Sequence, residues 1–163
     1  MPRYMMRVRM ATVIPSILAL VLAVVWAQRE RAQARERAAL LDSQTINLDQ
    51  LKMGDFTDQG KTVGRIGLYV RGETPGCSSL VTGRFIIDPG KSPHAPHVHE
   101  DEEILIVESG HGEIFCDGKT TKVGPGSVMY STPNVSHGIT NTGSEPLTFT
   151  FVKWVPRTGS AAK

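Results

Sequence analysis

From about residue 61 onward, apolar and polar residues alternate in short runs that are separated by turn residues. A period of two is typical of a strand with one buried face. Glycine and proline punctuate the runs, which is typical of sandwiches and barrels. No internal repeat is visible, so the pattern predicts one barrel over residues 61–156. Besides the apolar strand around residues 104–107, the predicted strands cover residues 62–70, 78–87, 113–116, 120–123, 128–131, 136–140 and 147–155.

The first 27 residues follow a different pattern. Residues 1–10 are rich in methionine and arginine, and residues 11–27 are uncharged and mostly apolar. This layout is typical of a cleaved export signal. The run is also about the shortest that could span a bilayer as an uncleaved anchor, and a buried helix is a third alternative. Both leading alternatives predict an exported, periplasmic or secreted barrel that contacts a membrane only through residues 11–27, if these stay uncleaved. N-terminal sequencing of the fractionated protein would distinguish them.

The stretch between the apolar run and the barrel predicts a helical spacer and connector over residues 28–60. Residues 28–41 are strong helix formers with no glycine or proline, and their thin apolar face favours a solvated helix. Residues 42–60 are mostly polar. At the other end, the small and polar residues 157–163 predict a disordered tail.

Charge and cysteine content narrow the class of protein. The net charge is +2, and the arginines gather in the first forty residues, so the barrel offers no polyanion-binding surface and we expect no nucleic-acid partner. Cys77 and Cys116 could pair in an oxidising compartment, although two separate thiols are favoured.

The most informative stretch is the one around His97 and His99. One residue separates these two histidines, and side chains two apart in an extended strand point to the same face. Glu103 keeps the same parity, so one ion could be bound by two imidazoles and a carboxylate. Farther along, His137 follows a Pro-Asn turn and could supply a fourth ligand from a distant strand.

Both segments resemble the two sequence motifs of the cupin family, over roughly residues 78–155. The matching positions are His97, His99, Glu103 and Gly110 in the first motif, and Gly126, Pro133, His137 and Asn141 in the second. Gly90 lies one position farther from His97 than in the family pattern. The glycine that usually lies between proline and histidine in the second motif is missing, and Pro133 is one position closer to His137. These departures fall in turns and leave the four ligands in place.

The resemblance implies a single antiparallel jelly-roll β-barrel with one divalent transition metal bound by His97, His99, Glu103 and His137. This donor set suits Fe, Mn, Ni, Cu, Zn or Co better than Ca or Mg. The resemblance implies a small-molecule oxygenase or isomerase in which Glu103 also has a catalytic role. The alternative is a non-catalytic barrel that binds a metal or a small ligand, including a closed zinc site. Cupins often form dimers, so a homodimer is expected, and the outward residues Ile104 and Ile106 are compatible with it.

The remaining histidines and several pocket candidates have more ordinary interpretations. His94 is expected at the rim of the site, with a fifth-ligand role as the alternative, and His111 is expected to be exposed in a turn. Asn141 has the parity to face inward, or it could brace its turn. Further residues that could line a pocket, or only pack within the barrel, are Arg84, Met129, Tyr130, Phe149 and Phe151.

Overall fold

The computed structural model describes residues 13–157, apart from the side chains of residues 13–18, 20 and 36–38. The chain divides into an N-terminal helical unit and a β unit that begins at Leu40. The basic stretch 1–10 and all of the predicted tail after Arg157 lie outside the described residues.

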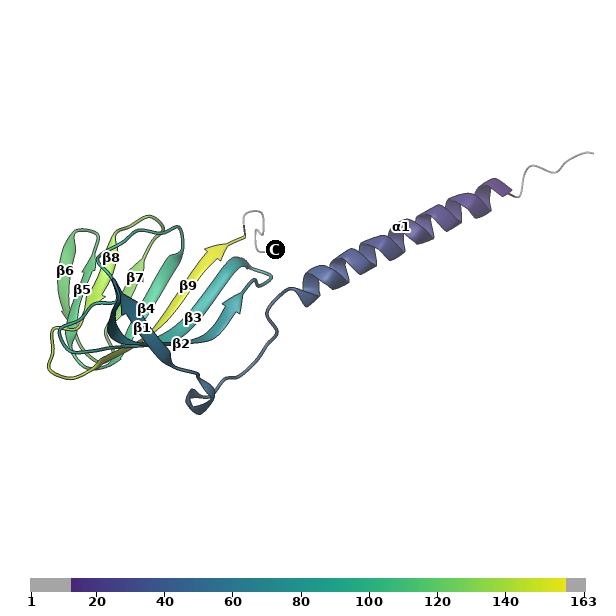
Figure 1. The fold of residues 1–163 in the computed structure, drawn as a ribbon. Coiled ribbons are helices and arrows are strands. Elements are labelled where there is room, and N and C mark those ends of the chain that lie inside the picture. Colours follow the sequence, from purple (N-terminus) through teal and green to yellow (C-terminus); the bar gives the residue numbers. More distant parts are fainter. Residues whose placement is uncertain (1–12, 158–163) are drawn as a thin grey trace, which may run out of the picture. The chain divides into compact units, whose positions relative to one another are not determined.

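In the described part of the N-terminal unit, one helix, α1 (Val13–Ala38), is present (Figure 1). It runs without a break from the apolar run into the charged spacer, although the sequence pattern predicts these as separate segments. The helix is continuous because neither glycine nor proline occurs between residues 16 and 38, and the charged residues there are strong helix formers. Within the described residues, no helix has both the length and the apolarity that crossing a bilayer requires. Export remains a prediction.

The β unit is a two-sheet jelly roll whose named strands all pair antiparallel (Figure 1). One sheet has the strand order β1-β2-β3-β9-β4-β7 and the other has the order β6-β5-β8. A short 3-10 helix, Leu48–Gln50, precedes the sheets. The strands are β1 (Gly54–Asp58), β2 (Lys61–Gly72), β3 (Cys77–Ile87), β4 (Glu102–Ser109), β5 (Gly112–Cys116), β6 (Lys119–Val123), β7 (Val128–Ser131), β8 (His137–Thr140) and β9 (Leu147–Pro156).

Strand β1 is the main difference from the expected strands, because it lies inside the predicted connector. It pairs with β2 through a tight turn in which Gln59 and Gly60 both have positive φ, 47° and 76°. Such a turn matches the twist of a hairpin, but glutamine is an unusual first residue for it, so the turn was not predicted. The Phe56 ring then packs edge-on against Phe85, with the ring centroids 5.1 Å apart. This contact extends the apolar core to β1.

The hydrophobic core lies between the two sheets and consists of the inward residues of the paired strands. Phe85 of β3 and Phe149 of β9 are opposite each other in register and stack with parallel rings, 5.6 Å between centroids. The buried apolar residues are Val81, Phe85, Ile87, Leu105, Val107, Ile114, Met129, Ile139, Leu147, Phe149 and Phe151.

The cysteines lie in different sheets, Cys77 at the start of β3 and Cys116 at the end of β5, and both are free thiols. The favoured prediction of two separate thiols is therefore confirmed. On the outer face of the larger sheet, Ile106 is 39% exposed and Ile104 is half-buried, so both point outward as expected. A homodimer through this face remains a prediction.

The packing of β1 predicts an unequal effect of two alanine substitutions in the N-terminal part of the β unit. Phe56→Ala should lower the free energy of unfolding by about 2 kcal/mol, roughly half the cost for a fully buried phenylalanine, because its ring is only half-buried. Leu48→Ala is the control, because Leu48 is 56% exposed and should change stability by no more than about 0.5 kcal/mol. Urea denaturation measures both. Equal effects would show that β1 does not pack on the core.

Candidate metal centre

A pair of backbone hydrogen bonds brings the two motif segments together. The amide of His97 donates to the carbonyl oxygen of His137, and the amide of His137 donates to that of His97, both at 3.0 Å. In addition, the amide of Asn134 donates to the carbonyl oxygen of His99 at 2.8 Å. Asn134 has a φ of 63°, which asparagine tolerates better than most residues, and this turn makes the contact possible. The backbone therefore fixes the spacing of the histidines before any side chain contributes.

The three histidines converge on one point, as the parity argument predicts. The ligand atoms of His97, His99 and His137 all lie within 4.8 Å of one another. The local structure differs from the expected strand, because β4 begins only at Glu102, and His97 pairs with His137 in an isolated bridge. The side chains of residues 97–99 nevertheless alternate between the interior and the surface, because Val98, between the two histidines, is 55% exposed.

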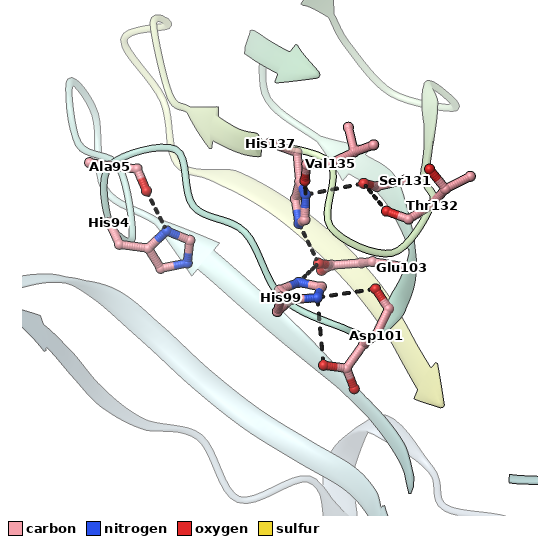
Figure 2. Close-up of polar contacts among 9 residues, drawn as sticks. All are labelled: His94, Ala95, His99, Asp101, Glu103, Ser131, Thr132, Val135 and His137. Carbon is pink, nitrogen blue, oxygen red and sulfur yellow. Dashed lines mark hydrogen bonds and ion pairs between the residues drawn. The ribbon is translucent and has the colours of Figure 1, made fainter. Parts of the chain in front are cut away.

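Glu103 reaches the same point from β4. Its side chain faces the interior, and the residue is 8% exposed. One carboxylate oxygen, Oε2, lies 2.9 Å from Nε2 of His137 and 3.1 Å from Nε2 of His99 (Figure 2). The structure thus brings together all four residues that the sequence predicts as ligands.

Hydrogen bonds behind the imidazoles set their orientation (Figure 2). Nδ1 of His137 lies 2.8 Å from the carbonyl oxygen of Val135 and 3.1 Å from the Ser131 hydroxyl. Nδ1 of His99 lies 3.1 Å from the carbonyl oxygen of Asp101. A carbonyl only accepts, so each Nδ1 carries the proton and donates it. In the neutral rings, the Nε2 lone pairs then point toward Glu103.

Burial and close packing shift the pKa values at this centre in opposite directions. The hydrogen bond to Glu103 raises the pKa of His137, although burial opposes the shift. Burial alone would raise the pKa of Glu103, but hydrogen bonds and charge from the histidines bring it below its usual value. Burial and the neighbouring imidazoles lower the pKa of His97 to about 4. His97 is therefore neutral near pH 7, the form in which imidazole binds a metal.

The donor set fits a divalent transition metal. Three imidazole nitrogens and one carboxylate oxygen are borderline ligands that suit Mn to Zn, whereas Ca and Mg prefer all-oxygen sites. His97 supports the fit, because its Nδ1 is buried and has no hydrogen-bond partner among the described residues. In addition, the Nε2 lone pairs of the neutral His99 and His137 rings repel the Glu103 carboxylate. A cation bound between them would remove this repulsion.

Beside the imidazoles lies a cavity of about 150 Å³. Its walls are mostly apolar and include Met129, Phe149 and Phe151, which were candidates either for the pocket or for barrel packing. Tyr130 and Arg84, for which the sequence left a pocket position and barrel packing open, do not line the cavity and lie on the outer face of the larger sheet. The Tyr130 hydroxyl donates to Glu102 at 2.6 Å, and Arg84 forms an ion pair with Glu108 at 2.7 Å. Both occupy the parity that points away from the core, as the neighbouring inward residues Met129 and Phe85 show.

The remaining two histidines and Asn141 lie outside the cluster of ligand atoms. His94 lines the cavity, and its ring packs edge-on against that of His97, with centroids 4.0 Å apart. His111 is exposed, as expected. Asn141 is fully buried and braces its turn, because its amide donates to the carbonyl oxygens of Ile87 and Glu145 at 3.0 and 2.8 Å.

Sequence reasoning missed Lys153, which lines the cavity beside Glu103 and His137. A signal for it was present. Residues 147, 149 and 151 of β9 are apolar and share one parity, so residue 153 should face the same interior. A lysine at the end of an inward-facing row is unusual enough to mark a candidate functional position.

Comparisons with known proteins identify the fold and match part of the chain to a family. Residues 83–153 match the Cupin_2 family model, described as a cupin domain. An RmlC-like cupin from Shewanella frigidimarina is 15% identical, with a TM-score of 0.57, over 72% of this chain and 95% of that chain. A predicted oxalate decarboxylase from Thermotoga maritima is 20% identical, with a TM-score of 0.56, over 69% of this chain and 99% of that chain. The Fe(II) form of HppE is 19% identical, with a TM-score of 0.57, over 70% of this chain and 62% of that chain.

The contacts of the Glu103 carboxylate with His99 and His137 predict how the histidine rings titrate in the metal-free protein. After chelation, NMR titration of the histidine rings should place the pKa of His137 above its usual 6.5 and that of His97 near 4. Glu103→Gln should bring the pKa of His137 down toward 6.5, because the amide cannot stabilise the imidazolium as a carboxylate does. An unchanged His137 pKa in this variant would contradict the contact.

The contact between Glu103 and His137 should stabilise the folded protein most strongly over a limited range of pH. Because the pKa of His137 is raised on folding, its contribution is complete below pH 6.5 and is lost as the pH rises through the raised value. The pKa of Glu103 is lowered, so its contribution is present above pH 4.5 and is lost as the pH falls through the lowered value. The stability difference between wild type and Glu103→Gln should therefore be largest between these limits.

Proposed function

We propose that this small cupin-barrel protein is a metal-dependent enzyme of the oxygenase or isomerase kind that acts on a small molecule. His97, His99, Glu103 and His137 would bind one divalent transition metal. The observation that supports this proposal best is the cluster of three imidazoles at the wall of a cavity, two of which contact one carboxylate oxygen of Glu103. A site built only for stability would not require space for a second molecule beside it.

A divalent ion held here supplies a Lewis acid and, if it is redox-active, one-electron chemistry. The protein residues orient the imidazoles and form the walls of the cavity. Ser131 and the carbonyl oxygens of Val135 and Asp101 hold two imidazoles in place from behind, so they need little reorganisation when a substrate binds. The apolar walls exclude water and thereby strengthen electrostatic contacts inside the cavity.

Glu103 is the residue best placed to transfer a proton. Its carboxylate lines the cavity, and its lowered pKa keeps it ionised near neutral pH. A substrate that binds beside it can deliver a proton to Oε2, the atom that otherwise contacts Nε2 of His99 and His137. Both proposed reaction classes, oxygenation of an ionisable substrate and isomerisation through an enol, require such a proton acceptor.

The rival function is a barrel that holds a metal or a small acid without turnover. The fold does not decide between the two, because one fold supports many chemistries. The structures to which the barrel is similar illustrate this point, since one is described as a predicted oxalate decarboxylase and another as an Fe(II) protein. The discriminating feature is reactivity of the loaded site.

Metal analysis tests the ligand set. Purified wild-type protein should bind one ion per chain, and the double variant His97→Ala/His137→Ala should lose it, because two of the four donors are gone. His111→Ala is the matched control, since His111 is exposed and lies outside the cluster. Stoichiometric metal in the double variant would contradict the proposed site.

Turnover tests the enzyme proposal. The metal-free protein is loaded in turn with Fe, Mn, Ni, Cu, Zn and Co, and each form is offered catechols and keto acids. Oxygen uptake or substrate isomerisation with one metal, absent in Glu103→Gln, is the expected result, and metal content is measured for every sample. Saturable binding of a small acid without turnover by any loaded form would favour the rival function.

A further inference from the structure

Strand β9 places Lys153 on the interior face next to the metal centre. In the antiparallel register, Lys153 lies directly opposite Glu103 of β4 and Val81 of β3. Directly opposed side chains of neighbouring strands share one face of the sheet. Val81 and Glu103 are both buried, and Lys153 lines the same cavity as Glu103 and His137.

Within residues 13–157, no ion pair engages the ammonium group of Lys153, although Glu103 is its neighbour across the strands. The Glu103 carboxylate is occupied by two imidazoles instead. The charge of Lys153 nevertheless acts on the centre, because it helps to lower the pKa of Glu103 and weakly opposes the increase in the pKa of His137. A half-buried cation without a counter-ion is available to an anionic ligand.

The cavity limits the size and polarity of that ligand. Its volume is about 150 Å³, and its apolar walls include the aromatic rings of Phe85, Phe149 and Phe151. An engineered apolar cavity of about this volume in another protein holds one benzene molecule. The polar groups gather around Glu103, the imidazoles and Lys153, so a ligand that fits should be apolar at one end and anionic at the other.

We propose that Lys153 is a specificity-determining residue that binds the anionic group of a small, single-ring or similarly sized apolar monocarboxylate. The apolar body of the ligand packs against the phenylalanine rings, and its carboxylate lies between the ammonium and the metal centre. This proposal rests on the proposed function for the identity of the site, but the contact with Lys153 does not require the ion. With a divalent ion present, Lys153 leaves the site with a net positive charge that favours anions over neutral analogues.

Benzoate is the probe, and benzamide is its neutral counterpart of nearly the same shape. Isothermal titration calorimetry with the Zn-loaded protein avoids redox chemistry, and the metal-free protein is titrated in parallel. Wild type should bind benzoate at least tenfold more tightly than benzamide. Lys153→Gln should weaken benzoate binding by roughly tenfold to a hundredfold, the loss expected for one charge-assisted hydrogen bond, and leave benzamide binding unchanged.

Lys153→Arg and Lys122→Gln are the control variants. Arginine keeps the charge and should retain most of the benzoate affinity. Lys122 is exposed on β6 and is not among the residues that line the cavity, so its loss should have no effect. A merely structural role of Lys153 would change stability or metal content but not the preference for benzoate over benzamide.

Two outcomes would overturn the inference. One is benzoate affinity within twofold of wild type in a folded Lys153→Gln variant, and the other is no saturable benzoate binding by the wild-type protein. The metal measurement separates this failure from failure of the proposed function. If no metal binds but the metal-free protein still prefers benzoate through Lys153, the inference stands and the metal centre does not.

Discussion

The pairing of His97 with His137 through two backbone hydrogen bonds is the constraint on which the site depends. His97 lies in the loop before β4 and His137 begins β8, so the residues are far apart in the chain and only the folded jelly roll brings them together. Once the bridge forms, the imidazole of His137 lies against the carboxylate of Glu103, and the carbonyl of Val135 fixes its tautomer. The folding free energy of the barrel thus positions ligands that would otherwise repel one another.

Glu103 connects the centre to the core. It is flanked on β4 by the buried residue Leu105, and on the neighbouring strands by Ser131 and Lys153. A buried carboxylate is costly unless it is neutralised by partners. Here two imidazole nitrogens lie within 3.1 Å of the carboxylate, and they can donate to it only when the rings are protonated, so a cation at the same point would neutralise it while the rings stay neutral. The same burial that makes the carboxylate costly in isolation makes the cluster suited to an ion.

Much of this arrangement could be predicted from the sequence because it depends on parity and on local spacing. His97, His99 and Glu103 share a parity, and that property survives even though His99 lies in a loop rather than a strand. The positions of β1 and Lys153 were harder to predict. β1 depends on a glutamine in a left-handed conformation and on the distant Phe85, neither of which a local pattern reveals. The sequence pattern of β9 predicts that Lys153 faces inward, but a lysine is usually assumed to face solvent.

Arg84 and Tyr130 show that residue type alone does not place a side chain in the pocket. Each follows the outward parity of its strand and pairs with an acidic residue there. Lys153 follows the inward parity of β9 and pairs with none in the described part of the chain. In this barrel, strand parity therefore determines whether these polar side chains meet an acidic residue on the outer face or line the interior cavity. That difference makes the lysine, rather than the arginine or the tyrosine, the residue that would select an anionic substrate.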